Sequence, residues 1–171
     1  MIYGKNILFL IGKNIPLIFN ITKTCLLMEK FNFFIGTWTL KYTVPKSVLS
    51  AAATGSGEGT FRRALNDKFV FFDYHAELTL GSARAHGIFA RDKSKDIYKY
   101  WWFEDSGSFM TATCNFIDKN TLMMNWHDTN FIQTFEKMDD DHIILKMSQP
   151  FREQQFKPVL VVDLLRKQKT G

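Results

Sequence analysis

An alternation of apolar and polar side chains can be followed in one phase from Phe69 to Phe135. A period of two indicates β-strands with one buried face and one solvated face, as in antiparallel sheets. The intervening positions carry most of the charge. The apolar positions form six groups, with a few hydroxyls and amides among them: Phe72, Tyr74, Ala76 and Leu78; Ala85, Gly87 and Phe89; Tyr98, Tyr100 and Trp102; Phe109, Thr111, Thr113 and Asn115; Leu122, Met124 and Trp126; Phe131, Gln133 and Phe135.

Strand-like segments recur along the whole of the chain after residue 35, about every 8–12 residues, which is typical of an all-β barrel or sandwich. Such a long meander favours a single up-and-down antiparallel β-barrel of about ten strands, because closure removes the exposed edges of an open sheet. No helical period runs through this part. The expected strands lie near residues 36–44, 56–65, 68–80, 83–91, 96–104, 108–117, 121–127, 130–138, 142–149 and 158–167.

Turns rich in Gly, Asn, Asp and Ser separate these segments and set the expected pairing of the strands. A two-residue loop at 81–82 places Glu77 opposite His86 on the outer face. A second one at 106–107 places Trp102 opposite Thr111 on the inner face. Further loops are expected at 119–120 and 128–129.

Residues 1–27 have a different composition, rich in Ile, Leu, Asn and Lys and without strand alternation. We interpret them as an N-terminal extension before a domain of residues 28–171, with Met28 as the true start. A signal peptide with the apolar run Ile7–Ile11 is the alternative. Ile7–Ile11 and the second apolar run, Ile15–Ile21, are both too short to span a bilayer, so no stable membrane insertion is expected.

Charge and cysteine usage narrow the function classes. The chain has 22 Lys and Arg, 17 Asp and Glu, and a net charge of +5; three lysines lie in residues 1–27, which leaves +2 for the remainder. The basic residues are scattered, so no nucleic-acid partner is predicted. Cys25 and Cys114 make no disulfide framework. A cytoplasmic protein is expected, or a secreted one if residues 1–27 are a signal peptide.

Several motifs occur in an order that resembles a known family. Gly36 and Trp38 form a Gly-x-Trp at the start of the first strand, similar to the calycin superfamily of lipocalins and fatty-acid-binding proteins. Gly36 would let the chain cross close to the barrel floor, and Trp38 would plug that end. The wider order resembles the lipocalin-like domain-of-unknown-function 1579 family over about residues 29–167. That resemblance implies a ten-stranded barrel and no established activity or site residues. The remaining motifs are Gly55-x-Gly57-x-Gly59, His86-Gly87-Ile88-Phe89, the Asp92 turn and Tyr98-x-x-Trp101.

Two related classes of barrel fit less well. Fatty-acid-binding proteins have a helical lid, whereas this chain offers only Ser47–Thr54 there, and their Arg-x-Tyr carboxylate clamp is absent from Val162–Arg166. Haem-binding nitrobindin-type barrels need a late histidine that reaches the lumen. The late histidine here, His142, follows the acidic turn Asp139–Asp141 and is expected in solvent. We therefore predict no cofactor.

The inner face is the strongest candidate for a functional surface, because mostly apolar walls with sparse polar groups are typical of small-molecule pockets. Small neighbours around Tyr100 and Trp102 suggest open space there, so Gly87→Leu is expected to abolish binding and to leave the fold intact. A core packed solid is the alternative. We predict a ligand that is small and apolar or aromatic, contacting Trp38, Tyr74, Gly87, Tyr98, Tyr100, Trp102, Thr111, Thr113, Asn115, Met124, Trp126 and Gln133.

Two other functions stay open. An enzyme of isomerase, cyclase or hydrolytic type would use the lumen tyrosines or the Glu77–His86 pair. The near-absence of inward titratable groups argues against it, and no catalytic residue is assigned. No metal site is predicted, because His86 and His127 lie too far apart on the expected sheet. A homodimer would cover the outward apolar residues Phe69, Phe71, Trp101, Phe103, Met110, Phe116 and Met123.

Overall fold

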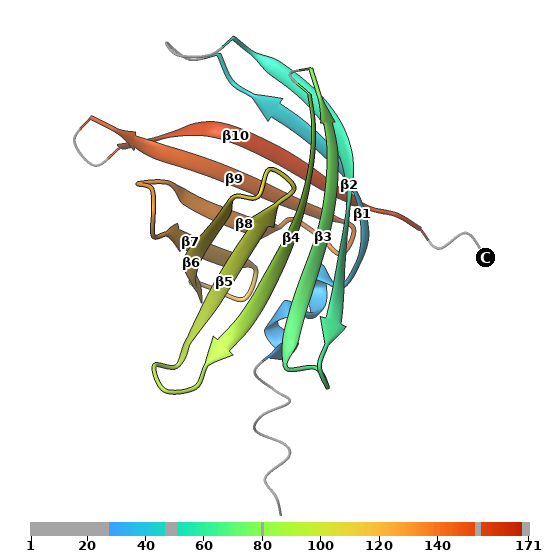
Figure 1. Cartoon of the computed structure of the whole chain (residues 1–171), viewed down its shortest axis with the longest axis vertical. Helices are drawn as coiled ribbons and strands as arrows, with labels where there is room; N and C mark the ends of the chain where they lie inside the picture. The colour runs from blue at the N-terminus through green and yellow to red at the C-terminus, as the bar shows by residue number, and fades with distance from the viewer. Residues whose placement is uncertain (1–27, 47–50, 80, 153–154, 169–171) are drawn as a thin grey trace, which may run out of the picture.

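The computed structural model describes residues 28–46, 51–79, 81–152 and 155–168, and these residues form a closed β-barrel. Each strand pairs antiparallel with its neighbours in the chain, and β1 pairs with β10 to close the sheet (Figure 1). The predicted all-β, ten-stranded, up-and-down barrel is confirmed. After a 3-10 helix, η1 (Glu29–Phe34), the strands are β1 (Gly36–Val44), β2 (Ala53–Ala64), β3 (Phe69–Leu78), β4 (Gly81–Asp92), β5 (Ile97–Glu104), β6 (Phe109–Phe116), β7 (Thr121–Trp126), β8 (Ile132–Lys137), β9 (His142–Phe151) and β10 (Gln155–Arg166).

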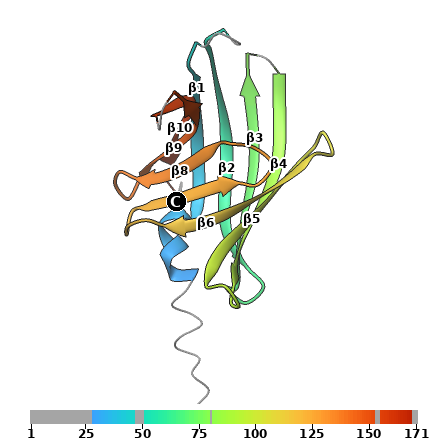
Figure 2. The same cartoon turned by 90° about the vertical axis from the view of Figure 1, so that its left-hand side faces the viewer.

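The helix η1 closes one end of the barrel, at the bottom of both views (Figures 1 and 2). Its residues Phe31 and Phe34 are fully buried. The Phe31 ring lies 5.1 Å from the ring of Phe89, and the Phe34 ring lies 5.0 Å from that of Phe61. Burying one such side chain stabilises the fold by about 1.5–3 kcal/mol. The lower half of the barrel is therefore a solid aromatic core.

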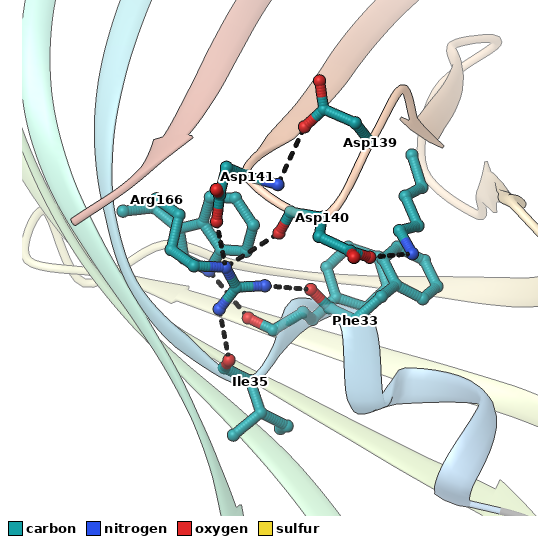
Figure 3. Close-up of polar contacts among 9 residues, drawn as sticks. Phe33, Ile35, Asp139, Asp140, Asp141 and Arg166 are labelled. Carbon is teal, nitrogen blue, oxygen red and sulfur yellow. Dashed lines mark hydrogen bonds and ion pairs between the residues drawn. The ribbon is translucent and has the colours of Figure 1, made fainter. Parts of the chain in front are cut away.

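Arg166 at the end of β10 fastens this closed end (Figure 3). Its guanidinium donates hydrogen bonds to the carbonyl oxygens of Ile35 at 2.8 Å and Phe33 at 2.9 Å, and to that of Asp140 in the β8–β9 turn at 2.8 Å. It also lies 4.2 Å from the ring of Trp38. One side chain thus joins the first strand, the last strand and a turn between them, while Trp38 plugs the floor as predicted.

The Gly55-x-Gly57-x-Gly59 motif lies in the strand β2. Its glycines occupy inward positions opposite β3. A Cβ on Gly57 would lie 2.3 Å from the backbone oxygen of His75, and one on Gly59 would lie 2.6 Å from the ring of Phe72. Only glycine permits β3 to approach β2 this closely. The two strands keep a regular antiparallel register along this glycine-rich stretch.

The register between β3 and β4 differs from the predicted one. Leu78 pairs with Gly81, so residues 81–82 begin β4 instead of forming a loop. Glu77 consequently pairs with Ser82. His86 pairs with Asp73. The shift is by an even number of residues, so inner and outer faces are kept, but the predicted Glu77–His86 pair is wrong.

The predicted orientation of β6 is also wrong, because the loop before it has three residues. The amide of Glu104 bonds to the carbonyl of Ser108 at 2.9 Å, and Gly107 has a φ of +84°. A three-residue hairpin loop with glycine in this left-handed conformation is a common alternative to a two-residue one. Trp102 therefore pairs with Met110 instead of Thr111.

The loop after β6 also has three residues instead of the predicted two, because the amide of Ile117 donates a hydrogen bond to the carbonyl of Thr121 at 3.0 Å. Only β6 is turned over, and β7 and β8 keep the predicted faces, including the expected pairing of Met124 with Gln133. Thr111, Thr113 and Asn115 face outward. The inward residues of β6 are Met110, Ala112, Cys114 and Phe116, of which Met110 and Phe116 had been assigned to the outer face.

Candidate ligand-binding site

A cavity of about 200 Å³ lies within the barrel, and neither Phe31 nor Phe34 of the helical plug lines it. One wall is aromatic and comes from β3, β5 and β7: Phe72, Tyr74, Tyr100, Trp102 and Trp126. The facing wall is aliphatic and comes from β1, β9 and β10: Leu40, Leu145, Met147, Leu160, Val162 and Leu164. The lining is completed by Tyr42, Glu104, Met110, Gln133 and Phe135.

Glu104 is a carboxylate on the lining of this largely apolar cavity. One of its oxygens accepts a hydrogen bond from Trp102 Nε1 at 3.0 Å. The other accepts one from Ser106 Oγ at 3.3 Å. The expectation that the lumen is almost free of titratable groups therefore missed one. Alternation in β5 carries the inner face from Tyr98 through Tyr100 and Trp102 to Glu104, so the signal was present.

Tyr42 and Tyr74 form a polar pair on the lining. Their rings are 6.1 Å apart at an angle of 73°, and the hydroxyls share a hydrogen bond. Burial raises the pKa of Tyr74; the Tyr42 hydrogen bond lowers it, and the charge of Glu104 raises it further. Burial likewise raises the pKa of Tyr42 far above its ordinary value. Both phenols stay protonated at neutral pH and serve as hydrogen-bonding groups, not as bases.

Gln133 and Trp126 form a second polar pair on the lining. The indole Nε1 of Trp126 donates to Gln133 Oε1 at 3.3 Å, and Gln133 Nε2 donates weakly to Met124 Sδ at 3.7 Å. Among the described side chains, no buried nitrogen or oxygen is left without a hydrogen-bond partner. The site is thus already satisfied internally and can accept an apolar ligand without stranding a polar group.

Five of the predicted contact residues line the cavity, and four others lie inside the barrel away from it. Trp38 and Tyr98 belong to the closed end, where the Tyr98 ring meets Phe31 at 5.1 Å. Met124 is buried beneath Gln133. Gly87 faces inward as well. The residues that do line the cavity are Tyr74, Tyr100, Trp102, Trp126 and Gln133.

The space beside Gly87 is filled, contrary to the prediction of open volume there. A Cβ on Gly87 would lie 2.1 Å from the hydroxyl oxygen of Tyr100 and 2.7 Å from its Cε2. Gly87 therefore gives room to the fully buried ring of Tyr100. Glycine at position 87 was expected to mark a pocket, whereas the ring of Tyr100 occupies the space beside it.

The remaining three predicted residues lie outside the barrel. The hydroxyls of Thr111 and Thr113 make hydrogen bonds with the imidazole of His127 at 2.9 and 2.7 Å, on an exposed surface. Asn115 is exposed too. The sequence analysis in turn assigned no contact residue to β9 or β10, which supply most of the aliphatic wall.

Other titratable clusters lie on the outer surface. His86 Nδ1 is 2.6 Å from Asp73, and His75 Nε2 is 3.0 Å from Glu77. His142 pairs with Asp163 at 2.8 Å on the outer face, and no histidine lines the cavity. Within residues 28–168 as far as they are described, no three His, Cys, Asp or Glu side chains are grouped to hold a metal ion. None of the described helices has the length and apolarity needed to cross a bilayer.

Solved structures of low sequence identity share this fold. The protein Rv2717c from M. tuberculosis aligns with a TM-score of 0.59 and 10% identity, over 83% of this chain and 98% of its own. The S-type phycobiliprotein lyase CPES from Guillardia theta aligns with a TM-score of 0.54 and 7% identity, over 84% and 94%. No protein-family model and no curated protein matches the sequence. The chain is thus a closed antiparallel barrel of the lipocalin and fatty-acid-binding-protein type.

Proposed function

We propose that this lipocalin-like barrel binds a small apolar or aromatic molecule in its cavity. The observation that carries the proposal is the cavity itself, about 200 Å³ with an aromatic wall facing an aliphatic one. A dry protein cavity of about 150 Å³ holds benzene, so this volume suits a molecule of one or two fused rings. Mostly apolar walls with a few placed polar groups are typical of ligand pockets.

The comparisons are consistent with a binding role without fixing a ligand. The similar protein from Guillardia theta is, by its name, a phycobiliprotein lyase. We further propose that the chain belongs to the domain-of-unknown-function 1579 family, on the order of its Gly-x-Trp and later motifs. A homodimer and a cytoplasmic location stay predictions. Phe103 and Phe109 remain exposed near the open end and support the dimer.

No enzymatic function is proposed. The Glu77–His86 pair does not form, because each residue has a different partner on the outer face. Burial raises the pKa of Tyr74 and Tyr100, so neither phenol supplies a base at neutral pH. These observations count against the outer Glu77–His86 pair and against a phenolate base in the lumen.

The proposal can be tested with a large side chain that is introduced on the aliphatic wall and fills the cavity. Leu145 lines the cavity, and its neighbour Ile144 occupies the opposite face of β9. We expect 1-naphthylmethanol, a neutral two-ring probe, to bind the native protein and Ile144→Trp but not Leu145→Trp. Isothermal titration calorimetry measures the binding, and circular dichroism checks that both variants are folded.

Two results would contradict the proposal. One is a native protein that takes up no probe, together with native mass spectra of protein from its source organism that show no added mass. The other is equal affinity in Leu145→Trp and the native protein, which would place the probe outside the cavity.

A further inference from the structure

Glu104 has no charged partner in the part of the chain that the structure describes. Its two hydrogen bonds come from neutral donors, the indole of Trp102 and the hydroxyl of Ser106. None of the ion pairs among the described residues includes it. A carboxylate offers about four acceptor sites, so capacity remains for a further donor.

Among the described residues, none that lines the cavity has a positive side chain to neutralise this carboxylate. No Lys, Arg or His is among the residues that line it. Glu104 is half-buried, and a charge that is partly removed from water is stabilised by a partner of opposite sign. An anionic ligand would meet an uncompensated negative charge at Glu104. A cationic ligand would supply the missing partner.

Aromatic rings stand beside the carboxylate in a fixed arrangement. The hydrogen bond to Glu104 holds the indole of Trp102, whose ring lies 5.4 Å from that of Tyr74 at an angle of 53°. Tyr42 meets Tyr74 edge to face from the next wall. A ligand cation within about 6 Å of such ring faces is attracted by their electron density, and aromatic cages bind ammonium groups in this way.

We propose that the cavity selects an amine: an aromatic or apolar molecule with one protonated ammonium group, which lies between Glu104 and the rings of Tyr74 and Trp102. This inference rests on the proposed binding function and adds the ligand's charge to it. The ammonium donates to the free acceptor sites of Glu104, while the one or two rings of the ligand fill the space in front of Leu145 and Leu160. The cavity volume of about 200 Å³ suits one or two rings better than a long acyl chain.

The effect of Glu104 on Tyr74 is consistent with this placement. Burial raises the pKa of the Tyr74 phenol, the Tyr42 hydrogen bond lowers it, and the negative charge of Glu104 raises it further, while both residues line the same cavity. An ammonium placed between them would face a carboxylate and a neutral phenol oxygen, both of which accept hydrogen bonds. The same position is unfavourable for a carboxylate ligand.

Three probes that differ only in charge test the inference: 1-naphthylmethylammonium, neutral 1-naphthylmethanol and 1-naphthoate. We expect calorimetry at neutral pH to give the order amine, alcohol, carboxylate for the native protein. Glu104→Gln keeps an oxygen for the Trp102 bond and should lower the affinity for the amine at least tenfold, with little change for the alcohol. Glu77→Gln removes the same charge from the outer face of β3 and should leave all three affinities unchanged.

The outcomes separate this inference from the proposed function. If the alcohol binds but the amine has no advantage, or if Glu104→Gln weakens both equally, the preference for a cation is refuted while the pocket stands. If Glu77→Gln has the same effect as Glu104→Gln, general surface charge accounts for the preference and the inference fails. If no probe binds, the proposed function fails and this inference with it.

Discussion

Gly87→Ala is the substitution for which the structure sets the clearest expectation. The added Cβ would stand 2.1 Å from the Tyr100 hydroxyl and 2.7 Å from its ring, whereas ordinary contacts are 3.4–4 Å. Tyr100 cannot retreat into the core, because the ring of Phe89 lies 4.2 Å behind it. Its remaining free direction is the cavity that it lines. The substitution should therefore both strain the core and narrow the pocket.

Overpacking of this kind costs about 1–3 kcal/mol of unfolding free energy. For a chain of this size, each kcal/mol lowers the melting temperature by about 2–4 °C, so we expect a fall of about 2–12 °C. Calorimetry or circular dichroism gives the melting temperature, and a titration with 1-naphthylmethanol should show weaker binding. Gly87→Leu should lower both the melting temperature and the affinity further, and its loss of stability is contrary to the expectation from the sequence that this variant keeps its fold.

A double-mutant cycle identifies the cause. Tyr100→Phe removes the atom nearest to the new Cβ, so the Gly87→Ala penalty should be smaller in that background. Gly107→Ala is the matched control: it has open space around it and a φ of +84°, so its cost arises from backbone strain alone. Its effect should add to that of Tyr100→Phe within about 0.5 kcal/mol. The reasoning would be refuted if Gly87→Ala were as stable as the native protein. It would also be refuted if Gly87→Ala lost the same stability in the Tyr100→Phe background as in the native one.

Three further outcomes are expected. Arg166→Met removes three hydrogen bonds from a charged donor, each worth about 1.5–3 kcal/mol. The urea midpoint should fall by at least the equivalent of one of these bonds, while the dependence of the unfolding free energy on urea stays unchanged. A variant with the native midpoint would show that the closed end is stable without Arg166. The buried phenols of Tyr42 and Tyr74 have raised pKa values in the folded protein. Their contribution to stability is therefore complete below the pKa of an unfolded tyrosine, about 10, and is lost as the pH rises above it. Tyr74→Phe should make the melting temperature depend less on pH in this range, and an unchanged dependence would count against the pair. Burial raises the pKa of the Cys114 thiol, so iodoacetamide at neutral pH should leave Cys114 unmodified until urea unfolds the chain. Peptide mass spectrometry measures the modification. Rapid alkylation of Cys114 in the folded protein would contradict its burial.

The barrel could be predicted from the sequence because alternation and turn chemistry are local properties. The strand count, the direction of each strand and the inner face of most strands depend only on neighbours in the chain. The phase of β6 failed because a loop of two residues and one of three differ by a single position. Gly107 carried the available clue, since glycine at the third loop position favours the left-handed conformation found there.

The site was predicted only in half, because a pocket is set by contacts between distant segments. Closure of the barrel brings Leu160 of β10 to the same cavity as Tyr74 of β3, and no local pattern relates the two. Whether space remains beside Gly87 depends on the exact register with β5, which pairs Gly87 with Trp102 and Phe89 with Tyr100. Glu104 sat on the inner face by alternation, yet its place on the cavity wall follows from the curvature of the sheet.

The Arg166 clamp also bears on how the protein is made. Its hydrogen bonds to Ile35 and Phe33 span 131 and 133 residues of sequence, whereas the nine hairpins of the meander are local. During synthesis the hairpins can assemble one after another as they leave the ribosome, but the helical plug stays without its fastening until β10 has emerged. Phe31 and Phe34 can contact Phe89 and Phe61 as soon as β4 and β2 have formed, but the Arg166 hydrogen bonds that hold η1 to the last strand are still missing. The closed end of the barrel is therefore completed only by the last strand to be synthesised.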